Sequence, residues 1–182
     1  MLAGPPCSGK SSVGRVLAAH RLHSRQAVYL EVDALFLLLL PESDRNRQDR
    51  RLAYDAAHAP ARTVVDRGRL AILECTYARR EQRGSLSRAL STTSWAPLWV
   101  VELAVAPDDA VQRFRRRRDA TDLDEGAVRE RAENFPYSRE ALQLQSSAAP
   151  PDDLADAIAG WLRRRPRPVD RNRWAAEGRP WR

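Results

Sequence analysis

The sequence predicts an α/β fold in which helices cover both faces of an open sheet. Apolar stretches of strand length alternate with helical patterns as far as about residue 162. The stretch from Leu98 to Val105 is nearly all apolar, which is typical of a strand buried on both faces of a parallel sheet. A glycine-rich loop separates the first apolar stretch from the first helical pattern. Strands that alternate with helices in this way predict a layered arrangement with the sheet in the middle.

Apolar spacing and the residues that end each segment place the individual elements. In the first helix, Val13, Val16 and Leu17 recur at the spacing of one buried face. Strands are expected at Leu2–Ala3, Ala27–Val32, Leu70–Cys75, Leu98–Val105 and Leu142–Gln145. Helices are expected at Ser11–His20, Asp33–Leu40, Leu52–Arg69 with a break at Pro60, Arg79–Ser91, from Pro107 into the following arginines, Glu125–Asn134, and Asp152–Leu162 with an aspartate cap.

Two parts of the chain lie outside this pattern. Residues 1–162 are expected to form one domain, whereas residues 163–182 are rich in arginine and proline and are expected to be a disordered basic tail. Only three residues precede Gly4, fewer than the five or six of an ordinary strand, so we expect the natural start to lie upstream of Met1.

Composition excludes several classes of protein. The longest apolar run, Ala34–Leu40, is far shorter than the roughly 20 residues that span a bilayer, and no signal peptide is recognisable, so a cytoplasmic protein without membrane contact is expected. Cys7 and Cys75 cannot build a disulfide framework. The three histidines show no metal spacing and are expected at the surface; they are His20, His23 and His58. The net charge of +7 leaves nucleic acid open as a partner, with solvated arginine faces as the favoured explanation.

The loop Gly4-Pro5-Pro6-Cys7-Ser8-Gly9-Lys10-Ser11 fits the pattern G-x-x-x-x-G-K-S at every fixed position. In such a P-loop, backbone N–H groups and the positive end of the following helix surround the phosphates of a nucleotide. Lys10, the only lysine among 31 basic residues, would reach the β- and γ-phosphates, and Ser11 would hold Mg²⁺. With Ser12 added, this loop is the predicted binding site for ATP and Mg²⁺.

Polar residues also end the second and third strands. Asp33 follows the second strand and could take a proton from an acceptor hydroxyl, hold a Mg²⁺-bound water, or simply cap the next helix. Glu74 ends the third strand beside Thr76 and is the candidate that orients the metal's water shell, with a solvated strand end as the alternative. The carboxyl ends of strands are where open α/β sheets bind ligands, so these residues are expected to share one site.

A run of arginines follows the fourth strand. Arg113, Arg115, Arg116, Arg117 and Arg118 form the densest charge in the chain. Arg113 and Arg117 would share a helical face, and one of them could stabilise the charge on a transferring phosphoryl group. A solvated helix end is the alternative.

With these motifs identified, the chain resembles the small kinase-like P-loop proteins known as AAA-domain ATP-binding proteins, whose relatives include polynucleotide kinases, chloramphenicol phosphotransferase, zeta toxins and gluconate kinase. The resemblance runs from Leu2 to about Leu162, through the P-loop, Val32-Asp33-Ala34, Leu73-Glu74-Cys75-Thr76-Tyr77 and Ala106-Pro107-Asp108-Asp109. It implies a three-layer P-loop NTPase fold with a parallel sheet of five strands. It also implies an arginine-bearing lid near residues 113–124, and matches Asp33 to an acceptor-side aspartate.

Three positions depart from the family pattern. Phe36 stands where the family often has arginine, which weakens a nucleic-acid kinase reading. Glu74 replaces a common aspartate and can serve the same purpose from one methylene further out. Cys7 replaces a common glycine and narrows the backbone freedom of the loop.

Three functions remain open from the sequence. The leading hypothesis is an ATP-dependent phosphotransferase acting on a hydroxyl group of a small molecule. In that hypothesis Lys10, Asp33, Arg113 and Arg117 are the catalytic candidates, and Ser11 and Glu74 are the metal-site candidates. The alternatives are a 5′-end polynucleotide kinase and a nucleotide-binding regulator with little turnover.

Overall fold

The computed structural model describes residues 1–22, 26–91, 96–117 and 122–180. At its centre is a five-stranded sheet with the strand order β2-β3-β1-β4-β5, and every neighbouring pair is parallel. The strands are β1 (Leu2–Ala3), β2 (Val28–Glu31), β3 (Ala71–Glu74), β4 (Val101–Ala104) and β5 (Leu142–Gln145). The parallel sheet expected from the sequence is confirmed.

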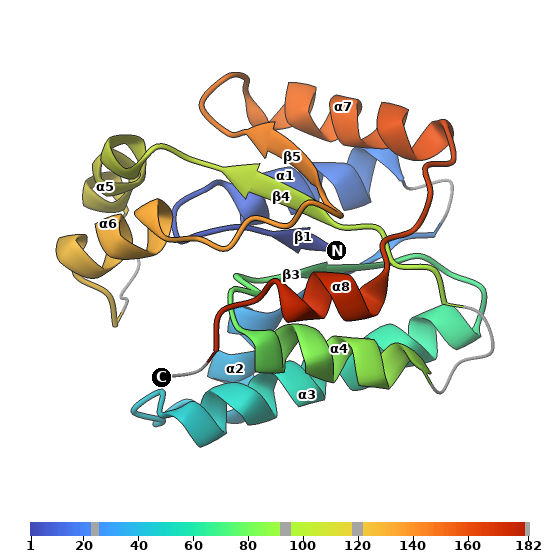
Figure 1. Ribbon diagram of the computed structural model, residues 1–182, viewed down its shortest axis with the longest axis horizontal. Helices are drawn as coiled ribbons and strands as arrows, with labels where there is room; N and C mark the ends of the chain where they lie inside the picture. The colour runs from blue at the N-terminus through green and yellow to red at the C-terminus, as the bar shows by residue number, and fades with distance from the viewer. Residues whose placement is uncertain (23–25, 92–95, 118–121, 181–182) are drawn as a thin grey trace.

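Helices cover both faces of the sheet, which gives the three layers seen in Figure 1. One face carries α1 (Lys10–Val16), which continues as a π-helical turn (Leu17–Arg21), and α7 (Pro151–Arg163). The other face carries α2 (Val32–Leu39), α3 (Arg47–Asp66), α4 (Arg80–Ser91) and α8 (Arg171–Ala176). The remaining pair, α5 (Pro107–Arg116) and α6 (Glu125–Glu133), packs together beyond the carboxyl ends of the strands.

The central strand β1 is very short, yet it is fully integrated into the sheet. Leu2 and Ala3 are buried, and β1 pairs with β3 on one side and β4 on the other. The N–H of Cys75 donates to the carbonyl of Leu2, and the N–H of Val101 donates to that of Met1. The loop that follows β1 therefore begins at a fixed point in the middle of the sheet.

Three expected features of the helices were wrong. Helix α3 runs without interruption through Pro60, because the buried Ala57 and Ala61 continue one apolar face across the proline and packing outweighs one lost hydrogen bond. It also begins at Arg47, where the Asn46 side chain caps the first N–H groups. Helix α7 begins at Pro151 after Pro150, so no aspartate caps it.

The C-terminal segment is packed rather than disordered, which corrects the expected tail for residues 164–180. Helix α8 lies against α4, and the Trp174 side chain has 0% of its surface exposed. After α8, Arg179 pairs with the chain at Arg79 through two backbone hydrogen bonds, Arg80 N to Arg179 O and Arg179 N to Ala78 O. The segment is held mainly by one large buried side chain, that of Trp174. A single buried residue leaves no apolar periodicity in the sequence, so the pattern did not predict this packing.

Arg83 connects this segment to the rest of the molecule. Its guanidinium is fully buried and donates to the carbonyls of Tyr77, Trp174 and Pro136 and to the Glu102 carboxylate. A buried arginine is stable only when its donors are paired in this way. Arg83 thereby connects four separate segments of the chain through hydrogen bonds.

His58 is buried, contrary to the surface position expected for it. Its Nδ1 lies 3.0 Å from Ser85 Oγ and its Nε2 lies 3.0 Å from Tyr77 Oη. Burial lowers the pKa of this histidine to about 4, because the charged ring would lose its hydration. His58 is therefore a neutral core residue, and His23 lies outside the described residues.

Candidate nucleotide and acceptor site

The loop between β1 and α1 has the backbone geometry of a phosphate cradle. Gly4 and Gly9 have φ angles of 150° and 82°, and a Cβ on Gly4 would stand 2.6 Å from the Leu103 carbonyl oxygen. Cys7 has a φ of 61°, so it adopts the left-handed conformation that glycine adopts more easily. Helix α1 starts with no side-chain cap, which leaves its first N–H groups directed at the loop interior.

The side chains of the loop also fit a bound triphosphate. Ser8 is fully buried and its hydroxyl has no hydrogen-bond partner among the described residues. Lys10 is 8% exposed and its ammonium donates to the Pro5 carbonyl at 2.9 Å, inside the loop. An ammonium with one carbonyl partner has donors left for phosphate oxygens. These features fit a nucleotide held by the residues that the motif predicts.

Ser11 and Glu74, the two metal-site candidates, are in direct contact. The Ser11 hydroxyl donates to Glu74 Oε2 at 3.1 Å, and Lys10 Nζ lies 4.0 Å from Glu74 Oε1. Glu74 is 4% exposed; burial raises the pKa of its carboxyl, and the Lys10 charge opposes that rise. Within the described residues no group of three or more acidic, histidine or cysteine side chains could hold a metal ion, so Mg²⁺ would depend on Ser11, phosphates and water.

Tyr29 and Glu31 are two further polar residues beside Glu74 that the sequence did not indicate. The Tyr29 hydroxyl donates to Glu74 Oε2 at 3.1 Å and lies 3.4 Å from Glu31 Oε2, which also accepts from Arg15. Tyr29 reaches this position because α1 has a glycine opposite it; a Cβ on Gly14 would stand 2.6 Å from the tyrosine ring. Tyr29 looks like an ordinary strand residue in the sequence, so nothing in its pattern marked it.

Asp33 is an exposed residue that lines a cavity of about 220 Å³. It belongs to the first turn of α2, whose N-cap is Glu31, so Asp33 does not have the cap role that was its alternative. Thr76 also lines the cavity, and its carbonyl accepts from the N–H of Gly4, the first residue of the P-loop. The cavity therefore lies beside the nucleotide loop and opens onto Asp33.

Cys75 lies between Asp33 and the core. Its Sγ accepts from the Tyr54 hydroxyl at 3.0 Å and lies 4.0 Å from Asp33 Oδ1. Burial raises the pKa of the Cys75 thiol well above its usual value, and the charges of Asp33 and Glu74 add to that effect. A buried neutral thiol is a poor nucleophile, so Cys75 is a wall of the cavity.

The arginines after β4 do not form the single face expected of them. Helix α5 ends at Arg116, and Arg117 has an extended backbone with φ −69° and ψ 140°, so Arg113 and Arg117 do not share a helical face. Arg113 Nη1 donates to the Cys7 carbonyl at 3.2 Å and to Ser146 Oγ at 2.9 Å, and Nη2 donates to the Ser146 carbonyl at 2.9 Å. Arg113 therefore braces the P-loop against the end of β5.

The other members of the arginine run differ from Arg113. Arg117 is exposed, and Arg115 makes a two-pronged ion pair with Glu125 on the surface. Arg118 and part of the expected lid, residues 118–121, lie outside the described residues.

The acceptor cavity takes most of its charge from arginines that the sequence reading did not single out. Five arginines line it, and each comes from a different segment. They are Arg45 in the loop before α3, Arg50 in α3, Arg79 in the loop before α4, Arg131 in α6 and Arg179 in the C-terminal segment. The apolar part of the wall comes from Phe36, Ala53, Phe135 and Pro136. No sequence signal distinguishes these arginines from the others in the chain.

Comparison with known proteins gives the family and the fold. The family described as an AAA domain matches residues 1–142, which is most of the chain. No curated protein matches the chain. Among the described residues, no helix combines the length and apolar character that crossing a lipid bilayer requires.

Solved kinases share the fold at low sequence identity. The adenylylsulfate (APS) kinase CysC of Mycobacterium tuberculosis, solved with AMPPNP and APS, has 19% identity and a TM-score of 0.69, covering 89% of this chain and 95% of that one. A gluconokinase from Sinorhizobium meliloti has 18% identity and a TM-score of 0.65, covering 90% of each chain. The shikimate kinase of Acinetobacter baumannii has 19% identity and a TM-score of 0.63, covering 90% and 92%. With its P-loop in the expected place, the chain belongs to the AAA-domain family and has the fold of the small P-loop kinases.

Proposed function

We propose that the protein is an ATP-dependent phosphotransferase that phosphorylates a hydroxyl group of a small molecule. The observation that carries this proposal is the cavity beside the P-loop, with Asp33 in its lining. A cavity of about 220 Å³ beside the phosphate loop gives a second molecule room next to the nucleotide, as transfer to an acceptor requires. The kinase neighbours share the fold in which such paired sites are found.

Each residue of the site has a role in this proposal. The loop Gly4–Ser11 holds the triphosphate, with Lys10 against the β- and γ-phosphates. Mg²⁺, held by Ser11 with Glu74 orienting its water shell, supplies charge neutralisation on the phosphate oxygens. The acceptor oxygen attacks the γ-phosphorus while the bond to the ADP oxygen breaks, and Asp33 takes the hydroxyl proton. Arg113 keeps the loop in place, and Arg117 contributes positive charge to the transferring group.

A screen of acceptors tests the proposal. Labelled ATP and Mg²⁺ are offered with sugars, nucleosides, antibiotics and 5′-hydroxyl oligonucleotides, and transfer of label is measured. Asp33→Asn should keep ATP affinity and lower transfer by about 10²-fold or more, because the amide cannot accept a proton. Full transfer by this variant would remove Asp33 from the reaction. ATP binding without transfer to any acceptor would instead indicate a regulator.

One observation favours a 5′-end polynucleotide kinase as the second candidate. Phe36 occupies a position where the family often has arginine, but the Arg45 guanidinium lies 5.2 Å from the centre of the Phe36 ring. Arg45 thus supplies a guanidinium to the same part of the cavity from another segment. In this case affinity for an oligonucleotide should fall steeply and linearly on a log–log plot against salt concentration.

A further inference from the structure

The five arginines that line the acceptor cavity differ in how their charges are compensated. Arg45 forms an ion pair with Asp122 at 3.1 Å, and Arg50 pairs with the same carboxylate. Arg179 forms an ion pair with Glu130 at 3.3 Å. Arg79 donates to the Pro180 carbonyl at 3.1 Å. Arg131, in the last turn of α6, makes no hydrogen bond or ion pair within the described part of the chain. All of its guanidinium donors are therefore left for a ligand.

The position of Arg131 is not that of a solvated surface arginine. It is half-buried, and its neighbours Arg50 and Arg79 add like charge. Burial lowers the pKa of Arg131, the charges of Arg50 and Arg79 act in the same direction, and Asp122 and Glu130 oppose them. Positive charge held at a partly desolvated place is stabilised by an anion that binds there.

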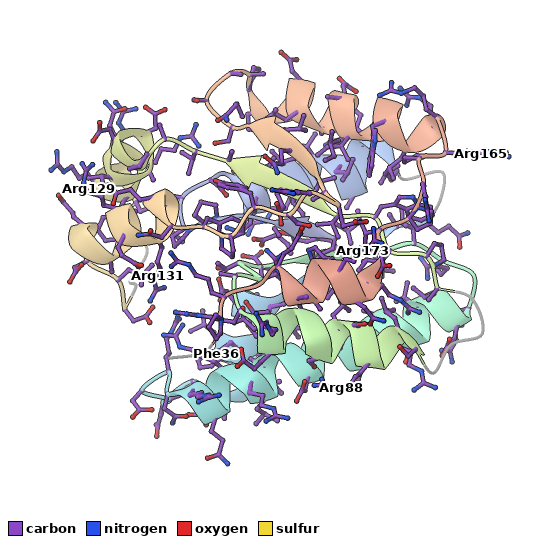
Figure 2. All side chains as sticks on the ribbon, viewed as in Figure 1. Phe36, Arg88, Arg129, Arg131, Arg165 and Arg173 are labelled. Atoms are coloured by element: carbon purple, nitrogen blue, oxygen red, sulfur yellow. The ribbon has the colours of Figure 1, made fainter. Side chains whose placement is uncertain are left out.

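The surroundings of Arg131 define where such an anion would sit. Figure 2 shows Arg131 on the side of α6 that faces the α2–α3 layer, where Phe36 lies, whereas Arg129 points away from the molecule. Arg131 and Phe36 line the same cavity as Asp33. The lining of one cavity thus combines a carboxylate, an aromatic ring and an unpaired guanidinium from α6.

We propose that Arg131 binds an anionic group of the acceptor, so that the substrate is a small molecule with a carboxylate or a phosphate in addition to the hydroxyl that is phosphorylated. The statement that the bound molecule is a kinase acceptor rests on the proposed function. The anion site itself does not depend on that function. A planar guanidinium binds either group through two parallel hydrogen bonds. Contacts with both Arg131 and Asp33 would also fix which hydroxyl faces Asp33.

A titration with inorganic phosphate tests the site without any turnover. The full chain carrying Lys10→Ala is used, so that the P-loop does not compete for the anion, and binding is measured calorimetrically at constant ionic strength. We expect one saturable site. Adding Arg131→Gln should weaken it by about tenfold or more, as expected for a lost charge-assisted pair of hydrogen bonds.

Arg129→Gln is the matched control. Arg129 lies on the same helix and has the same charge, but it pairs with Asp108 at 2.6 Å on the outer surface. It should leave phosphate affinity unchanged within about twofold, since an exposed pair contributes little. Equal losses in the two variants, or no saturable site in the Lys10→Ala chain, would overturn the proposal. If Arg131→Gln does not fold, Arg131→Lys and Arg129→Lys give the same comparison, because lysine keeps the charge and loses the fork.

The same titration with acetate distinguishes the two anionic groups. Tighter binding of phosphate indicates a phosphorylated acceptor, and tighter binding of acetate indicates a hydroxy acid; each supports the site. A measurable anion site with no transfer in the acceptor screen would mean that the proposed function fails while the anion site stands. Once an acceptor is known, Arg131→Gln should raise its KM by about tenfold or more and leave ATP affinity unchanged.

Discussion

The loop that would hold the nucleotide is eight consecutive residues, Gly4–Ser11, whereas the acceptor cavity takes its wall from α2, α3, α6, the loop after β3 and the C-terminal segment. The loop depends on local backbone angles at Gly4, Cys7 and Gly9 and on one helix start. The cavity depends on segments up to 147 residues apart, as from Val32 to Arg179. We call the loop the nucleotide half of the site and the cavity the acceptor half. Substitutions should therefore impair ATP binding in the first half and acceptor binding in the second.

The largest effect is expected in the nucleotide half. Lys10→Ala should abolish ATP binding or weaken it by about a hundredfold or more, because Lys10 is the only lysine and its ammonium lies inside the loop. Calorimetric titration with ATP and Mg²⁺ measures this directly. The acceptor half should be unaffected, so the melting temperature should stay close to that of the wild type. Unchanged ATP affinity would falsify the P-loop assignment.

Next in size is a change that should damage the acceptor half. Trp174→Ala should lower the free energy of unfolding by about 3–5 kcal/mol, because it empties a fully buried site between α8 and α4. Chemical denaturation followed by circular dichroism measures it. The neighbouring Arg173→Ala is the control, since that side chain is 77% exposed and should change stability by less than about 1 kcal/mol.

The same variant also distinguishes the two halves functionally. Loosening α8 releases the segment that carries Arg179, so acceptor KM should rise more than the dissociation constant for ATP. If the C-terminal segment contributed nothing to stability, Trp174→Ala and Arg173→Ala would have the same free energy of unfolding. That result would contradict a stabilising role for the buried Trp174.

A smaller effect, about 10²-fold in rate, is expected from the arginines after β4. Arg117→Ala should lower the maximal rate by that factor with little change in ATP affinity, because its charge is used mainly in the transition state. Arg113→Ala should do the reverse and weaken ATP binding by about tenfold, since it removes the brace between Cys7 and Ser146. Steady-state kinetics on a confirmed acceptor separates the two.

Arg115→Ala is the control for both arginine variants. Its guanidinium pairs with Glu125 on the surface, so neither the rate nor ATP affinity should change by more than about twofold. If all three alanine variants behave alike, the run is a general electrostatic patch.

The smallest effect concerns pH and the core behind the cavity. The folded pKa of His58 is about 4 against an unfolded value of 6.5, so its contribution to stability is fully present above pH 6.5 and is lost as pH falls toward 4. From pH 7.5 to pH 5 the loss should be about 2 kcal/mol.

Replacement of the histidine isolates this contribution. Denaturation of the wild type and of His58→Gln at each pH should show a smaller loss in the variant, because glutamine does not titrate. His20→Gln, at an exposed position, should keep the wild-type profile. Identical profiles for wild type and His58→Gln would mean that His58 stays uncharged or solvated throughout this range.

The sequence by itself determined the nucleotide half and the order of the elements. The P-loop is a continuous motif, and the alternation of apolar strands with amphipathic helices fixed the parallel sheet, because both depend on local spacing. It also placed Asp33 and Glu74 at strand ends and Ser11 at the helix start that follows the first strand and its loop; the structure joins Ser11 to Glu74 at 3.1 Å.

Only the tertiary structure decided the acceptor half. Arg131 and Arg179 look like any of the other arginines until α6 and the C-terminal segment are placed beside α2. Tyr29 reaches Glu74 only because Gly14 lies opposite it, and Trp174 turns a proline- and arginine-rich segment into a packed one. The physical reason is the same in each case: these positions are set by contacts between segments far apart in the chain, and no local pattern of charge or hydrophobicity encodes a contact of that kind.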